Sequence, residues 1–173
     1  MRSSTEAEFS EFARVAWPQL FRTAVVMVGD RQLAEDLVQS ALVRAYVAWP
    51  RVRTSDRRQA YVRRVLVNVT NDWFRRRSST HEQVGVSAPL EHDEPAAGDH
   101  VSELVDRADL GDALRALPPG QRSVVALRFL EDLSVEETAD LLNVSRGTVK
   151  SQTSAALSAL RRHVESAHER FTP

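Results

Sequence analysis

The sequence predicts an all-α protein with two small helical domains joined by a flexible linker. Apolar residues recur at spacings of three and four along most of the chain, and no segment shows the sustained alternation of a β-strand. This periodicity stops over residues 81–101, which are rich in Gly, Pro and acidic residues and contain no Lys or Arg. Residues 1–80 and 102–173 are therefore expected to form the two domains, with the linker between them.

The first helical run is expected to start at residues 5–8, TEAE, which have the spacing of a capping box. Trp17-Pro18 is expected to break or restart this helix, because proline lacks a backbone donor. The run that follows should stop at Gly29, since glycine is a natural helix C-terminal cap.

Two long helices are expected next. Asp30 should cap the first of them, which runs to about Ala48 and ends at Trp49-Pro50. Its apolar face consists of Leu33, Leu37, Val38, Ala41, Leu42 and Ala45. The second covers about 57–77, with a buried stripe of Val62, Val65, Leu66, Val69 and Trp73.

This second long helix is strongly basic. Six of its polar residues lie away from the apolar stripe: Arg63, Arg64, Asn68, Asn71, Arg75 and Arg76. Arginine can hold a nucleic-acid backbone, asparagine can read a base edge and an aromatic ring can stack on a base, so this side suits single-stranded nucleic acid. On pattern alone, a solvated face with Trp73 in the core explains these residues equally well.

The second domain is also predicted to be helical. A helix is expected from Ser102 to about Leu117, where Pro118-Pro119-Gly120 interrupts the chain. Pro119 can occupy the first turn of the next helix. The apolar residues of that helix are Val124, Val125, Leu127 and Leu130.

A helix-turn-helix is predicted directly afterwards. A capping box at residues 134–137, SVEE, opens a short helix that ends near Leu142. The turn 143–145 follows, in which Val144 is expected to fill the gap between the helices and Ser145 to cap the second one. Ala139 is small where the two helices must cross closely.

The second helix of this motif has two contrasting faces. Its predicted buried face is Val149, Thr153, Ala156, Leu157, Leu160 and Val164. The opposite side carries short side chains together with Arg146 and Lys150, and residues 144–164 contain no acid. Short side chains let a helix approach a DNA groove while the cations reach bases or phosphates. An ordinary amphipathic helix is the alternative; the turn, the capping box and the missing acids together favour DNA.

Composition excludes several classes of protein. The absence of cysteine excludes disulfides and thiolate metal sites and fits a reducing, cytoplasmic location. No apolar run approaches the roughly 20 residues of a membrane helix, and the N-terminus lacks a signal-peptide core. The formal net charge of −1 hides a segregation, because residues 1–80 contain 14 arginines against eight acidic residues. No cofactor and no metal is expected.

The order of these parts resembles the extracytoplasmic-function (ECF) group of bacterial RNA polymerase sigma factors. The resemblance is carried by DRQLAEDLVQSALVRAYVAW, by YVRRVLVNVTNDWFRRR, and by LRALPPGQRSVVALRFLEDLSVEETADLLNVSRGTVKSQTSAALSALRR. The resemblance covers nearly the whole chain except the linker and the last residues. Within the group, the overall sequence is most similar to that of actinobacterial members. It implies a sigma-two-like domain, which docks on polymerase and melts the −10 element, and a sigma-four-like domain, which reads the −35 element.

The resemblance also implies roles for individual residues. Polymerase docking would fall on Asp36, Gln39, Val43 and Arg44, and many family members have an acid where this chain has Ser40. The −10 single strand would meet Arg63, Arg64, Asn68, Asn71, Arg75 and Arg76, with the loop 51–58. The −35 duplex would meet Arg146, Thr148, Lys150, Ser151 and Ser154.

The partners implied are core RNA polymerase, through its β′ clamp helices and β flap, and promoter DNA. An anti-sigma factor is compatible with the family, although no residue identifies one. The second domain is net acidic, so few phosphates would be neutralised and the free protein, expected to be a monomer, should bind DNA weakly.

Two other classes of protein fit the sequence less well. An enzyme is disfavoured because the five histidines are scattered and no nucleophile motif, phosphate loop or metal-spaced His pair occurs. A stand-alone helix-turn-helix regulator would use the same final helix, but it would need a dimer interface to pair half-sites and leaves the arginine-rich first domain unexplained.

Overall fold

The computed structural model describes residues 2–84 and 108–170, and these residues contain helices but no strand. The expected linker, 81–101, lies mostly outside the described residues. The expected helix start at Ser102 lies wholly outside them. The helical segments are α1 (Arg2–Val28), α2 (Arg31–Val52), α3 (Arg58–Val84), α5 (Ala108–Ala116), α6 (Pro119–Val125), η1 (Ala126–Leu130), α7 (Val135–Leu142) and α8 (Arg146–Arg170). None of the described helices is long and apolar enough to span a membrane.

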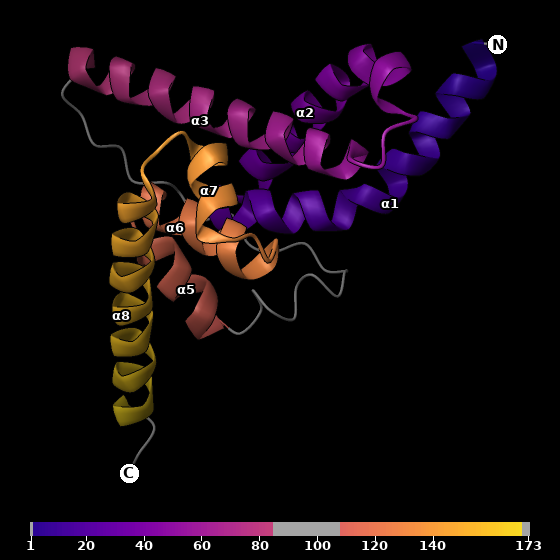
Figure 1. The fold of residues 1–173 in the computed structure, drawn as a ribbon. Coiled ribbons are helices and arrows are strands. Elements are labelled where there is room, and N and C mark those ends of the chain that lie inside the picture. The colour runs from indigo at the N-terminus through magenta and orange to yellow at the C-terminus, as the bar shows by residue number, and fades with distance from the viewer. Residues whose placement is uncertain (1, 85–107, 171–173) are drawn as a thin grey trace.

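Helices α1, α2 and α3 form the first bundle, in which each helix packs against the other two (Figure 1). The predicted corner between α1 and α2 is confirmed. Gly29 has a positive φ of 74° and its N–H donates to Val25 O at 2.8 Å. The Asp30 carboxylate accepts from Leu33 N at 2.6 Å and so caps α2.

Two predicted breaks are wrong, because α1 continues through Pro18 and α2 through Pro50. Both prolines lie on exposed sides of their helices. The carbonyl that each proline leaves without a helical donor can therefore accept from water, which lowers the cost of an interior proline. The start of α1 at Arg2 also rules out the predicted capping box at residues 5–8.

Helix α3 is longer than predicted, because it extends to Val84, and it is buried on more than one side. Val62, Leu66 and Val69 are buried as expected, whereas Val65 is only partly buried. Val67 and Thr70 are also buried, although the sequence placed neither of them in the core. They lie four and seven residues after Arg63, on the same face of the helix.

Helices α5, α6, α7 and α8, with the π-helical turn η1 after α6, form the second bundle. Pro119 occupies the first turn of α6, as predicted. Val124, Val125 and Leu127 are buried, in agreement with the expected apolar face, and Leu130 is partly buried.

The two bundles pack on one another, a contact that the sequence did not predict. Helix α1 lies between α3 on one side and the α6–η1 segment on the other (Figure 1). Most of the buried apolar residues form one core cluster, which includes Ala24 and Met27 of α1 as well as Val125 and Leu127. Arg122 of α6 donates to Met27 O at 3.2 Å, and partial burial lowers the pKa of this guanidinium.

Candidate nucleic-acid interface

The helix-turn-helix is formed by α7 and α8, with bounds that match the prediction closely. The capping box of α7 is complete: Ser134 N donates to Glu137 Oε2 at 2.8 Å, and Glu137 N donates to Ser134 Oγ at 3.1 Å. The hydrogen bond from the Ser134 backbone, and after it the bond with the Ser134 side chain, hold the pKa of the Glu137 carboxyl below its ordinary value. Asn143 ends α7 with a φ of 55°.

The crossing of α7 and α8 is held by a small apolar cluster. Val149 is completely buried and packs with Ala139 of α7 and Val124 of α6. The small side chain at position 139 therefore has the role predicted for it. Ser145 Oγ accepts from Thr148 N at 3.0 Å, which confirms Ser145 as the cap of α8.

Three apolar residues predicted to be buried in this motif are exposed instead. Val144 is 40% exposed in the turn, so it does not fill the gap between the helices. Leu157 lies to one side of the line through Val149, Ala156 and Leu160, and is 41% exposed. Val164 is on that line but is 48% exposed, because α8 extends beyond the helices that cover it (Figure 1).

The predicted −35 residues share the exposed side at the start of α8. Arg146, Lys150, Ser151 and Ser154 are exposed, and Thr148 is partly buried. The hydroxyl of Thr148 lies 2.9 Å from Ser145 Oγ and so belongs to the cap. Arg146 lies 3.4 Å from Glu136 of α7, an exposed ion pair that can exchange for a DNA contact at little cost.

The predicted −10 residues of α3 separate onto three faces. Arg64, Asn68, Asn71 and Arg75 follow one another at spacings of four, three and four, and therefore share one side of the helix. Asn71 is partly buried and the other three side chains are exposed. Two asparagines thus lie between two arginines along a single stripe that a strand can follow.

The two remaining arginines of the set lie elsewhere. Arg63 faces the second bundle and donates from Nε to Glu131 Oε2 at 2.7 Å. Arg76 lines a groove between α2 and α3, and its Nε donates to Asp72 O at 3.2 Å. The sequence-based set of six is therefore not one continuous surface.

The predicted polymerase-docking residues lie together on the outer side of α2. Asp36, Gln39, Val43 and Arg44 are all exposed, as expected from their position off the buried stripe. Val43 and Val47 are 65% and 78% exposed, and Tyr46 between them is also exposed. Exposed apolar side chains that lie together in this way suit a protein contact.

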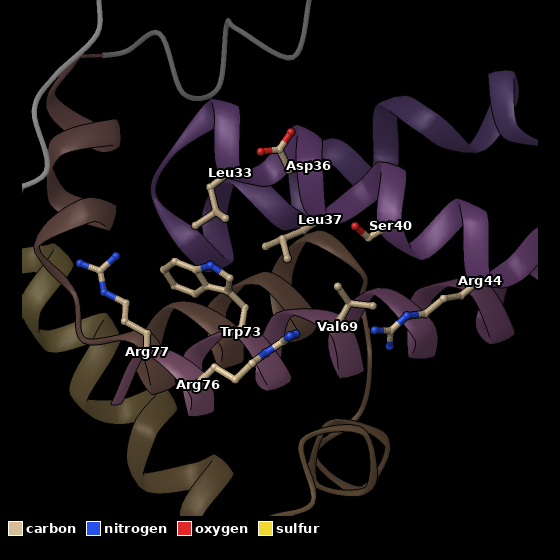
Figure 2. Close-up of a pocket in the computed structure, with 9 residues that line it drawn as sticks. All are labelled: Leu33, Asp36, Leu37, Ser40, Arg44, Val69, Trp73, Arg76 and Arg77. Carbon is tan, nitrogen blue, oxygen red and sulfur yellow. The ribbon is translucent and has the colours of Figure 1, made fainter. Parts of the chain in front are cut away.

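The α2–α3 groove adjoins this patch and has a volume of about 770 Å³. Figure 2 shows its floor, where Leu33 and Leu37 of α2 face Trp73 of α3. Its rim is polar and consists of Asp36, Ser40, Arg44, Arg76 and Arg77. Trp73 is partly buried and the Arg77 guanidinium lies 5.2 Å from the centre of its ring, so this ring belongs to the groove floor and is not an exposed platform for a base.

The described residues show no group of three or more His, Asp or Glu side chains that could hold a metal ion. The described residues form an arginine-rich helical bundle and a helix-turn-helix bundle, a combination typical of nucleic-acid-binding proteins. Family comparisons agree with both parts: the model of Sigma-70 region 2 matches residues 16–80, and that of Sigma-70 region 4 matches residues 107–160.

Relatives match across most of the chain. RNA polymerase sigma-E factor of Streptomyces avermitilis is 42% identical over 160 residues, which cover 92% of this chain and 86% of the relative. ECF RNA polymerase sigma factor SigL of Mycobacterium tuberculosis is 32% identical over 90% of this chain and 85% of the relative. The chain therefore belongs to the ECF-type RNA polymerase sigma factors, non-catalytic subunits that direct transcription initiation by RNA polymerase.

A solved structure supports the same arrangement of helices. The sigma factor RpoE in complex with the anti-sigma factor NepR from Bartonella quintana matches with a TM-score of 0.71 and 25% sequence identity. The match covers 91% of this chain and 96% of that chain, so it includes both bundles.

Sequence reasoning missed the residues that join the bundles, above all Gln19, Thr23 and Glu131. Glu131 follows an apolar helix and no local pattern marks it as buried, yet its side chain is only 4% exposed. One signal was available: residues 24–28, AVVMV, are apolar on every side of a helix, and such a helix must be covered on every side.

Proposed function

We propose that this chain binds core RNA polymerase through the outer side of α2 together with the α2–α3 groove. Support comes from Asp36, Gln39, Val43 and Arg44, which form one exposed surface with Val47. The groove extends this surface onto α3 and adds Trp73 and Arg76 to it. An apolar floor with a charged rim suits a helical protein partner, and the β′ clamp helices of polymerase are the partner that the family implies.

The same bundle is proposed to hold the single-stranded −10 element along α3. The observation that carries this proposal is the stripe of Arg64, Asn68, Asn71 and Arg75 on one exposed side. Arg64 and Arg75 would hold phosphates while the asparagines read base edges, with Arg63 joining them when it is released from Glu131. Arg76 leaves the DNA set, because it lines the groove.

The helix-turn-helix is proposed to read the −35 duplex with the start of α8. Arg146 and Lys150 would supply the long contacts, and Ser151 and Ser154 would let the helix approach the groove floor. Thr148 would act through the helix cap, since its hydroxyl faces Ser145. The protein would act in the cytoplasm with the polymerase, and an anti-sigma protein such as the one bound to the Bartonella relative would have to cover one of these surfaces.

A binding experiment tests the docking surface. Asp36→Arg combined with Gln39→Ala should lower the affinity for core polymerase while leaving the helical content unchanged, because both side chains are exposed. Asp140→Arg is the matched control, since it reverses an exposed charge on α7 outside both proposed surfaces of the first bundle. Equal polymerase binding by the double variant and the wild type would place docking elsewhere.

A promoter library tests the recognition helix. Lys150→Ala should weaken initiation similarly across promoters, and Arg146→Ala should cost about 1–3 kcal/mol and relax preference at one upstream base if it pairs with a guanine. If the two changes together leave upstream preference and initiation unaltered, α8 does not read the −35 element.

A further inference from the structure

One edge of α1 is built to bind the second bundle. Gln19, Thr23 and Met27 are spaced by four residues and therefore form a straight line along the helix. Gln19 Nε2 donates to Leu130 O at 2.9 Å, and the Thr23 hydroxyl lies 2.5 Å from Glu131 Oε1. Further along, Met27 O accepts from Arg122 Nε at 3.2 Å.

Glu131 connects this edge to α3. Its Oε1 bonds to Thr23 of α1 and its Oε2 accepts from Arg63 Nε at 2.7 Å, so both carboxylate oxygens have partners. The side chains of Glu131 and Arg63 are 4% and 23% exposed. A carboxylate is costly to bury unless it is paired and hydrogen-bonded, and here each oxygen accepts one hydrogen bond, one of them from a guanidinium.

The contact between the bundles also has an apolar part, which is formed by residues 24–28 of α1. Residues 24–28 are all buried, whichever side of α1 they occupy. The first bundle covers one side of this segment and the α6–η1 segment covers another. If the bundles separated, part of this surface and the Glu131–Arg63 pair would enter water together, so separation would be cooperative.

We propose that Gln19, Thr23, Arg63, Arg122 and Glu131 form an intramolecular latch that holds the free factor closed and blocks Arg63. This inference rests on the proposed function of α3 in binding the −10 strand. The Glu131 carboxylate makes with Arg63 the kind of charge-assisted bond that a DNA phosphate would make. The −10 strand and Glu131 therefore compete for one guanidinium.

The latch leaves the other proposed surfaces open. The docking residues of α2 and the start of α8 are exposed in the closed form. Polymerase can therefore engage the closed factor, and full use of α3 by DNA would require the second bundle to move away. The latch would thus suppress binding of the −10 strand by the free factor without blocking its recruitment.

Distance measurements on the free protein test the closed state. The chain has no cysteine, so Ser10→Cys with Ser158→Cys, two exposed serines on α1 and α8, places spin labels cleanly. Wild type and the control Asp140→Arg should each give one narrow distance distribution. Glu131→Arg puts a like charge beside Arg63 and should give a broader, longer distribution. Exchange of the pair, Arg63→Glu with Glu131→Arg, should restore the narrow one, which damage to folding would not do.

Strand binding tests the regulatory role. Apparent affinity falls with the fraction of competent molecules, so an opened factor should bind a −10 single-stranded oligonucleotide about tenfold more tightly or better. Thr23→Val and Glu131→Arg both weaken the latch without altering the proposed DNA residues. A broad distribution for the wild type, or an unchanged one for Glu131→Arg, would overturn the latch. Open variants that gain no strand affinity would overturn its role.

Failure of the proposed function would look different. If α3 does not hold the −10 strand, Arg64→Ala with Arg75→Ala would leave strand binding unchanged in the wild type and in the opened variants alike, and the distance distributions would still report whether the chain is closed.

Discussion

Val149 holds the helix-turn-helix together and allows a quantitative prediction. The residue is completely buried among Val124, Ala139 and the partly buried Val135 and Leu142. Val149→Ala removes two methyl groups, and at about 0.8 kcal/mol for each buried carbon the transfer free energy is about 1.6 kcal/mol. The cavity left behind raises the loss of unfolding free energy to about 2–3 kcal/mol.

Urea unfolding of the full chain, followed by circular dichroism, measures this loss. The matched control is Val144→Ala, the same change five positions earlier in the turn, where the side chain is 40% exposed. The control should lose less than about 1 kcal/mol. Footprinting with holoenzyme should show that Val149→Ala also weakens −35 protection, because α8 is no longer fixed on α7.

Comparable losses in the two variants would refute this account of the crossing. They would show that α8 is held by the contacts of Ala156 and Leu160 with the rest of the bundle, and that the position of the recognition helix does not depend on Val149.

Three further predictions follow from the first bundle and from α7. Arg64→Ala with Arg75→Ala should lower the salt dependence of −10 strand binding by about 1.4 in the log–log slope, at about 0.7 for each phosphate, whereas Arg76→Ala should instead weaken binding of core polymerase in a pull-down. Since the capping bonds lower the folded-state pKa of Glu137, its carboxylate stabilises the fold above the unfolded-state pKa of about 4.3, and this contribution is lost as the pH falls through the lower folded value. The stability gap between wild type and Glu137→Ala in urea should therefore be present at pH 7 and shrink below about pH 4. Pro18→Ala should raise the thermal midpoint, because α1 continues through this exposed proline; a helix that broke at this residue would show no gain.

Local signals predicted the parts of the fold that depend on neighbours in sequence. The Gly29–Asp30 corner, the Ser134 capping box and the bounds of α7 each follow from side chains within a few residues of one another. Proline was misread because its effect on a helix depends on exposure. Pro18 and Pro50 lie on the solvent side, and exposure is decided by the packing of the whole bundle.

Contacts between the bundles could not be predicted in this way. Glu131 and Arg63 are 68 residues apart, with the predicted linker between them. The residues around each of them contain no pattern that predicts the other as its partner. Val67 and Thr70 were missed for a related reason, because they form a second buried face of α3 and the search for one apolar stripe found only the first. The continuously apolar residues 24–28 show that such a face can still be detected as a helix with no polar side.

The arginines of α3 show why a charged helix should be divided by face before roles are assigned. Arg64 and Arg75 share one exposed side, Arg76 turns to the groove beside α2, and Arg63 is held by Glu131. A helix of this length presents separate sides to separate partners, since residues that are neighbours in sequence point about 100° apart. If the proposed function is right, the second bundle therefore competes with the −10 strand on only one of these sides, the one that carries Arg63. Polymerase docking and −10 recognition then become separable steps on the same helix, and the latch acts on the second step alone.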